Sequence, residues 1–301
     1  MLLCIGEILA DMIGEEKNGI TTYERKAGGA PFNVACALKK FGSDVKFVGN
    51  VGDDLIGDFL IKYAEDFGMD TAYINKDAER NTTLAFVELN EDGDRSFCFY
   101  RKNTADYHMP HVEDALIQSA DIVCIGSLML ANKGCVDYAL DIIERAHSLG
   151  KTVAFDVNYR TDIFRDTESA VKTYKKILSA ADIVKFSEDE VETFGEDYVD
   201  TLNDKLVLIT LGKEGSEWRF GGKQNRMPTI TVKPIDTTGA GDAFFAGALS
   251  VLDKSAKEAF TDELLNRAIS FGNVAGALNT TGRGAIDHLP DLDTINKYIN
   301  I

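Results

Sequence analysis

The 301-residue sequence is short of basic residues. It has 32 Lys and Arg against 49 Asp and Glu, which gives a formal net charge of −17 at pH 7. General nucleic-acid binders need a basic surface, so this excess of acid argues against that function. It does not exclude an anionic ligand, because backbone N–H groups and a few local cations can hold a phosphate within an acidic protein.

Cysteine, histidine and long apolar runs are also scarce. The five cysteines lie far apart without a Cys-x-x-Cys pair, and the four histidines show no zinc-site spacing, so we expect buried free thiols in a reducing compartment. No apolar run reaches the roughly 18 residues of a membrane span, and residues 1–7 lack the basic start of a signal peptide. We therefore expect a cytoplasmic protein with a large core that binds no membrane.

Short β-branched runs alternate with longer amphipathic segments along the chain. This alternation predicts a mainly parallel sheet covered by helices on both faces, an α/β fold. The predicted strands are 2–5, 45–49, 122–125, 152–157, 183–186 and 206–210. The predicted helices are 31–41, 54–67, 133–148, 168–179, 188–193, 240–252, 262–279 and 293–298.

Two insertions, at about 11–27 and 82–106, break the alternation. Residues 82–89 and 95–101 flank the Asn-Glu-Asp-Gly-Asp sequence at 90–94, which predicts a β-hairpin. We expect a small antiparallel sheet that covers the active site as a lid; the alternative is an added edge of the main sheet. No linker is evident, so residues 1–301 are predicted to form one domain with this lid. Its uncovered edges could pair two copies into a homodimer.

The strongest local motif is Asp-Thr-Thr-Gly-Ala-Gly-Asp at 236–242, which leads into a predicted helix. The first N–H groups of a helix lack internal partners, so Gly239, Ala240 and Gly241 predict an anion-binding cradle. Asp242, in the first turn, could accept the proton of an attacking hydroxyl while the cradle stabilises the transferred group. Taken alone, it could equally serve as a helix cap.

A second glycine-to-helix junction lies in Gly-Gly-Ala-Pro-Phe-Asn-Val-Ala at 28–35. Gly28 and Gly29 allow a ligand to approach the backbone closely. Asn33 offers both a donor and an acceptor to a vicinal diol, although ordinary helix capping is the alternative. Asp11 could bind the same hydroxyls from the other side, or be an exposed loop acid.

Further polar groups follow predicted strands, where α/β sheets place their ligands. Arg160 ends Phe-Asp-Val-Asn-Tyr-Arg at 155–160. Glu190 could hold Mg²⁺ through water, although an acidic helix start is the simpler interpretation. Thr-Leu-Gly-Lys-Glu-Gly at 210–215 is a candidate bed for a nucleotide.

With these motifs in order, the chain resembles the ribokinase-like (PfkB-type) sugar kinases along essentially its whole length. Residues 28–35 and 236–242 are similar to the two family signatures. The resemblance implies a three-layer α/β/α core with a β lid, and transfer of the ATP γ-phosphoryl group to a sugar hydroxyl, with Mg²⁺. It also implies that Asp242 is the catalytic base and that Gly239, Ala240 and Gly241 form the anion hole. The residues implied to bind the sugar are Asp11, Gly28, Gly29 and Asn33, and those implied to bind ATP are Thr210, Gly212, Gly215 and Asn273. A monovalent cation such as K⁺ is implied to bind at Asp236, Thr238 and Gly284.

One position departs from the family pattern. Ser187 stands where the family commonly has Asn in its Asn-x-x-Glu element, which puts that side chain's contact with Mg²⁺ or phosphate in doubt, while Glu190 is retained.

Within the family, Gly-Gly-Ala-Pro and the Phe-Cys-Phe-Tyr-Arg sequence at 97–101 are similar to bacterial fructokinases. Arg101 could direct a cation into the sugar pocket. Kinases of 2-keto-3-deoxygluconate share a similar aromatic-Arg pattern, and Arg101 and Arg160 could attract their carboxylate substrate. A non-catalytic sugar or nucleotide sensor is the alternative of another class. We expect an ATP-dependent kinase that converts fructose to fructose 6-phosphate.

Overall fold

In the computed structural model, residues 1–89, 95–164, 166–253 and 260–299 are described. The predicted hairpin turn at 90–94 lies outside them. Within these ranges, no helix has the length and apolar character needed to cross a bilayer.

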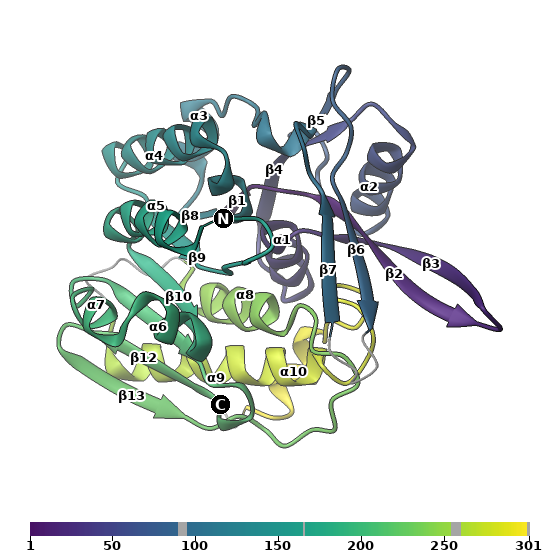
Figure 1. Cartoon of the computed structure of the whole chain (residues 1–301). Coiled ribbons are helices and arrows are strands. Elements are labelled where there is room, and N and C mark those ends of the chain that lie inside the picture. The colour runs from purple at the N-terminus through teal and green to yellow at the C-terminus, as the bar shows by residue number, and fades with distance from the viewer. Residues whose placement is uncertain (90–94, 165, 254–259, 300–301) are drawn as a thin grey trace.

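A nine-stranded sheet forms the centre of the molecule (Figure 1), with the strand order β13-β12-β11-β10-β9-β8-β1-β4-β5. Its strands are β1 Leu2–Ile5, β4 Val45–Gly52, β5 Ile74–Asp77, β8 Ile122–Ile125, β9 Thr152–Asp156, β10 Ile183–Ser187, β11 Leu206–Thr210, β12 Ser216–Phe220 and β13 Lys223–Met227. Pairing is parallel from β11 to β5, and β12 and β13 add an antiparallel edge. The expected mainly parallel sheet is confirmed; β5 and the β12–β13 hairpin were not predicted.

Helices cover both faces of this sheet. They are α1 Ala30–Lys40, α2 Leu55–Asp66, α3 Asp114–Ser119, α4 Lys133–Ser148, α5 Thr167–Ala180, α6 Glu188–Phe194, α7 Glu196–Asp200, α8 Ala240–Leu252, α9 Asp262–Asn279 and α10 Leu292–Asn296. Alternate residues of β1 enter different apolar clusters: Leu2 joins the one that contains α1, α8 and α9, and Leu3 the one that contains α4 and α5. This division produces the predicted three layers.

A separate sheet, in the order β3-β2-β6-β7, stands beside the main one (Figure 1). It contains β2 Leu9–Lys17, β3 Ile20–Gly28, β6 Leu84–Leu89 and β7 Arg95–Tyr100. The predicted small sheet is therefore present as a sheet of its own. It is not purely antiparallel as expected, because β2 and β6, which come from different insertions, pair in parallel.

The cysteines differ from expectation at one position. Cys4, Cys36, Cys124 and Cys135 are buried free thiols, but Cys98 is exposed. It lies on β7, where it pairs with Phe86 of β6 on the same face of the small sheet as Tyr100. The prediction of burial was wrong here because a strand in a thin sheet can turn apolar side chains outward.

The chain reverses its direction of travel across the sheet at β1. From β1 it moves outward through β4 to β5, then returns to the other side and continues from β8 to β11. In open parallel sheets, ligands bind outside the carboxyl ends of the strands at such a reversal. The segments that follow β1, β8, β9, β10 and β11 are therefore where the site is expected.

Candidate active site

Asp242 and Asn33 meet although 209 residues separate them. The Asn33 Nδ2 donates to Asp242 Oδ2 over 2.8 Å, which joins the first turn of α1 to the first turn of α8. Burial raises the pKa of Asp242 above its ordinary value, against the hydrogen bond from Asn33 and the charges of Lys185 and Arg160, which lower it. The result is a carboxylate held in one orientation and partly withdrawn from water.

The glycine loop before α8 has the geometry of an anion cradle. Gly239 is the N-cap of α8, with φ of 74° in the left-handed region, and a Cβ there would lie 2.7 Å from the Cα of Ala285. Only glycine suits that backbone and that contact. Ala240 and Gly241 follow as the first helical residues, with no side-chain cap over their N–H groups. The Ala240 N–H donates to the Thr237 carbonyl over 3.2 Å, and the N–H groups of Gly239 and Gly241 lie with Asp242 at the positive end of the helix.

The predicted sugar-binding residues gather at the base of the small sheet. Gly28 ends β3 opposite β2, and a Cβ there would collide with the Asp11 carboxylate. At Gly29, φ is 106°, and a Cβ would lie 2.5 Å from the carbonyl oxygen of Glu7. Asp11, Gly28, Gly29 and Asn33 thus lie around one turn that leads into α1.

The structure places Arg101, which was predicted to bind the sugar, in a buried position directly after β7. Its side chain is only 3% exposed; its Nε donates to Asp106 Oδ2 over 2.7 Å, and its Nη1 donates to the Leu128 carbonyl over 2.6 Å. The guanidinium also lies over the Tyr107 ring. Its charge is therefore compensated inside the protein, and Nη2 is the nitrogen that has no partner among the described residues.

Glu7, just beyond β1, was not predicted from the sequence. It is fully buried, and neither carboxylate oxygen has a hydrogen-bond partner in the described part of the chain. Burial raises its pKa to about 7, and the charge of Arg101 opposes that rise. An acidic residue in the apolar start Leu-Leu-Cys-Ile-Gly-Glu was the only signal available.

Glu190 and Ser187 form the start of α6. The Glu190 oxygens accept the backbone N–H groups of Tyr159 and Ser187, each over 2.7 Å, and Ser187 Oγ accepts the N–H of Glu190 over 3.3 Å. This is a capping box, so both residues have a structural role. Each carboxylate oxygen keeps a lone pair, and the chemistry of Glu190 therefore fits binding of a hydrated Mg²⁺ ion.

A pocket of about 680 Å³ opens between the end of β11 and helices α8 and α9. The predicted nucleotide residues Thr210, Gly212, Gly215 and Asn273 all line it, together with the cradle residues Ala240 and Gly241. Asn273 also donates to the carbonyls of Met227 and Pro228, which ties the β13 end to α9. Sequence reasoning did not identify the apolar lining from Ile230, Val232 and Phe244.

Asp236 organises the loop predicted to hold a monovalent cation. Its Oδ1 accepts the N–H of Thr238 over 2.8 Å, and its Oδ2 accepts the N–H of Gly284 over 2.9 Å. Two buried oxygens nearby, Thr238 Oγ1 and Asn279 Oδ1, have no partner among the described residues. Uncharged oxygens of this kind, close to one carboxylate, fit a cation such as K⁺.

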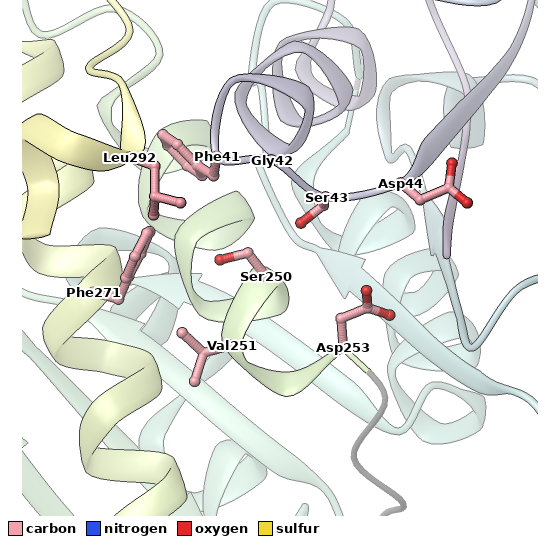
Figure 2. A pocket seen from close by; sticks show the side chains of 9 residues that line it. All are labelled: Phe41, Gly42, Ser43, Asp44, Ser250, Val251, Asp253, Phe271 and Leu292. Atoms are coloured by element: carbon pink, nitrogen blue, oxygen red, sulfur yellow. The ribbon is translucent and has the colours of Figure 1, made fainter.

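Two other hollows lie outside this group. One of about 830 Å³ lies under β7 and includes Arg101, Phe99 and Ile163, but not Asp11, Gly28 or Asn33. Another, of about 270 Å³, lies between the end of α1 and helices α8 and α9 (Figure 2). The Asp44 and Asp253 carboxylates line it, which does not suit a phosphate.

The site combines a pocket large enough for a nucleotide, N–H donors at the start of a helix that lines it, and a carboxylate in the same helix turn. These features suit the transfer of a phosphoryl group. An enzyme that moves a phosphoryl group from a nucleotide to a hydroxyl needs this positioning and little else. That is the class of protein that the fold and the site define.

Comparison with known proteins specifies the class further. The family model described as pfkB family carbohydrate kinase matches residues 1–292, and the chain belongs to this family. The resemblance and the expected class of enzyme, a carbohydrate kinase, are confirmed. The fructokinase of Vibrio alginolyticus is 34% identical over 303 residues, which are 98% of this chain and 97% of that protein.

Solved structures agree with this assignment. The fructokinase of Xylella fastidiosa, with bound ATP, has a TM-score of 0.92 at 30% identity and covers 98% of this chain and 97% of its own. The fructokinase of Vibrio cholerae O395, in its fructose, ADP and calcium ion bound form, has a TM-score of 0.88 at 29% identity, covering 99% and 98%. A double mutant of the latter was solved with fructose, ADP and a potassium ion, at a TM-score of 0.88 and 28% identity, covering 99% and 97%.

Proposed function

We propose that this protein transfers the γ-phosphoryl group of ATP to the primary hydroxyl of fructose and forms fructose 6-phosphate. The observation that carries the proposal is the position of Asp242, which is tied to the turn around Gly28, Gly29 and Asn33 on one side and adjoins the cradle of the nucleotide pocket on the other. The solved fructokinases with bound ATP, or with fructose and ADP, give it direct support.

Asp242 acts as the general base. Among the described residues Asn33 binds its Oδ2, and Oδ1 accepts the proton of the sugar hydroxyl. The hydroxyl oxygen then bonds to the γ-phosphorus while the bond from that phosphorus to the bridging oxygen breaks, and the electron pair stays on ADP. The N–H groups of Gly239 and Gly241, with the positive end of α8 at Ala240, stabilise the charge on the transferred group.

Two cations complete the proposal. Bound Mg²⁺ neutralises phosphate charge, and Glu190 would hold it through water. Asp236, Thr238 and Gly284 would hold a monovalent cation beside the cradle and keep the loop ordered, with the buried oxygens of Thr238 and Asn279 as further ligands.

Fructose is favoured over 2-keto-3-deoxygluconate by the environment of Arg101. Asp106 compensates the guanidinium charge, and the buried Glu7 adds a carboxyl group close to it. A substrate carboxylate would gain little from a cation that is already paired. The alternative substrate remains 2-keto-3-deoxygluconate, because the positive charge of Arg160 acts on Asp242 in the same site and could attract a carboxylate.

A coupled assay of ADP formation with a panel of sugars tests the assignment. We expect turnover with fructose and none, or far less, with 2-keto-3-deoxygluconate. Turnover of the keto acid alone would overturn the choice of substrate. Absence of turnover with every sugar, together with binding of ATP by calorimetry, would favour the non-catalytic sensor.

We also propose a homodimer that forms through the small sheet. Tyr23, Phe86 and Tyr100 make a continuous aromatic row across one of its faces, with ring centroids 5.0 and 5.2 Å apart. Tyr100 is 62% exposed and Tyr23 39% exposed, and such a patch is unusual on a surface that meets only water. Sedimentation velocity should give a dimer for the wild type and a monomer for Tyr100→Ser; a monomeric wild type would contradict the proposal.

We propose a cytoplasmic location because the cysteines are free thiols. Five free cysteines suit a reducing compartment. Fractionation of the source cells should recover the protein with cytoplasmic markers, and recovery with membranes or secreted material would refute this location.

A further inference from the structure

Lys185 is a charged side chain that the mechanism above does not use. It lies on β10 and is only 5% exposed. Its Nζ donates to Oδ1 and Oδ2 of Asp156, over 2.8 and 3.0 Å. An ammonium group has three N–H bonds, and the contacts with described residues use two of them. Within the described part of the chain, one N–H is therefore left for another acceptor.

The position of this ammonium follows from strand register. Lys185 and Asp156 are paired residues on the neighbouring parallel strands β10 and β9, so their side chains leave the same face of the sheet. That face is the one toward α8, since Ile183, two residues before Lys185 on β10, packs in the apolar cluster of α8 and α9. The lysine thus points from the sheet toward the start of the helix that carries the cradle.

The contact at Gly241 shows how close the Lys185 side chain comes to the cradle. A Cβ on Gly241 would lie 3.1 Å from Lys185 Nζ and 3.6 Å from its Cε. The cradle backbone is in contact with the end of the lysine, and the missing side chain at Gly241 leaves room for it. The ammonium therefore lies at the inner edge of the cradle, next to the donors proposed for the phosphoryl group.

The charges around Lys185 keep it protonated. Burial opposes its charge, but attraction by Asp156, Glu190 and Asp242 outweighs burial and raises the pKa of Lys185. A buried cation is costly to maintain, and in a site of low dielectric it acts strongly on any anion that enters. Placing such a cation beside the helix N–H donors of the cradle prepares the site for negative charge before the substrates arrive.

We propose that Lys185 is a catalytic residue whose third N–H binds an oxygen of the phosphoryl group in transfer, from the sheet side of the cradle, while Asp156 holds the ammonium in place. The inference rests on the proposed kinase function and adds a side-chain cation to it. In the transfer step Lys185 keeps its proton: the hydroxyl proton goes to Asp242, and the lysine stabilises the charge on the non-bridging oxygens.

Two variants separate this role from a structural ion pair. Lys185→Met removes the charge at similar length, and we expect kcat to fall at least ~100-fold, as when one preorganised donor is lost, with KM for the sugar nearly unchanged. In that variant Asp156 is left buried and unpaired, so its thermal stability should also fall. Asp156→Asn with Lys185→Met removes both charges and should recover the stability. A catalytic lysine predicts that kcat stays low in this double variant.

Chemical rescue provides a readout that stability cannot mimic. In Lys185→Ala, added methylammonium or ethylammonium ions should raise kcat in a saturable way, while ethylene glycol should not. Lys205→Met, which removes a lysine paired with Asp204 elsewhere on the chain, is the matched control and should keep wild-type kcat.

The outcomes are distinct. Recovery of both stability and kcat in the double variant, or wild-type kcat in Lys185→Met, would overturn the role of Lys185 and leave the kinase function standing. Absence of sugar phosphorylation by the wild-type protein would overturn the proposed function itself. All assays use the sugar that the wild type phosphorylates best.

Discussion

Ionisation of Glu7 should make the fold less stable as the pH rises. Burial raises its pKa from an ordinary value of 4.5 to about 7, and neither oxygen has a hydrogen bond to a described residue. A group whose pKa is higher in the folded state stabilises the fold while it is protonated. That contribution is complete below about pH 4.5 and is lost as the pH rises through 7.

The magnitude follows from the two pKa values. The rise from 4.5 to about 7, at about 1.4 kcal/mol per pKa unit, corresponds to a total penalty of about 3.5 kcal/mol at alkaline pH. Glu7→Gln has no such ionisation. The unfolding free energy of the variant minus that of the wild type should therefore increase by about 2.5 kcal/mol between pH 5 and pH 8. For a chain of this length that is roughly 4 °C in Tm.

Thermal unfolding followed by circular dichroism at pH 5, 6, 7 and 8 measures the difference. Glu65→Gln, on the exposed surface of α2, is the matched control, because it removes the same charge from the total without removing a buried one. Its Tm difference from the wild type should stay nearly constant across the series. A Glu7→Gln difference that is equally flat, or that moves toward the wild type at high pH, would refute the argument from burial.

Three further predictions concern the site and its support. Asp242→Asn should lower kcat by ~10²–10⁴. Near-wild-type turnover of this variant would reject Asp242 as the base. In the wild type, kcat/KM should fall as the pH falls, because a protonated Asp242 cannot accept a proton. Burial raises the pKa of Asp242, so this fall should occur at a pH above the usual Asp pKa of about 3.9. Gly272→Ala would place a Cβ 2.7 Å from the Phe244 carbonyl oxygen, so urea unfolding should show a loss of about 1–3 kcal/mol, and an unchanged midpoint would contradict the close packing of α8 on α9. Replacing K⁺ with tetramethylammonium should lower kcat if the loop around Asp236 holds a cation, and equal rates would remove that site.

The regular elements were predictable because they depend on local pattern. Helices α4, α8 and α9 have the predicted bounds, as do strands β1, β8 and β11. The β12–β13 hairpin was missed for a physical reason. β13 is polar and largely exposed, so it carries no alternation of buried and exposed positions to mark it as a strand.

The site was predictable where glycines and helix starts mark it, and not where two strands must meet. Lys185 lies in an apolar strand, and its partner Asp156 is 29 residues away. Only the register of β9 against β10 brings them together. For Arg101 the residue type predicted a ligand contact, but the sequence did not show that Asp106, five residues later, also pairs with it inside the protein.

The contact between Asn33 and Asp242 has a consequence for biosynthesis. The two residues belong to α1 and α8, which pack together on one face of the sheet, and α9 packs in the same layer (Figure 1). A nascent chain that has emerged only to the end of β11 can pair its parallel strands, but α1 still lacks its helical neighbours. Such an intermediate exposes one apolar face of its central sheet to the cell and offers it to chaperones or to aggregation. Premature termination before α8 should therefore yield an insoluble fragment.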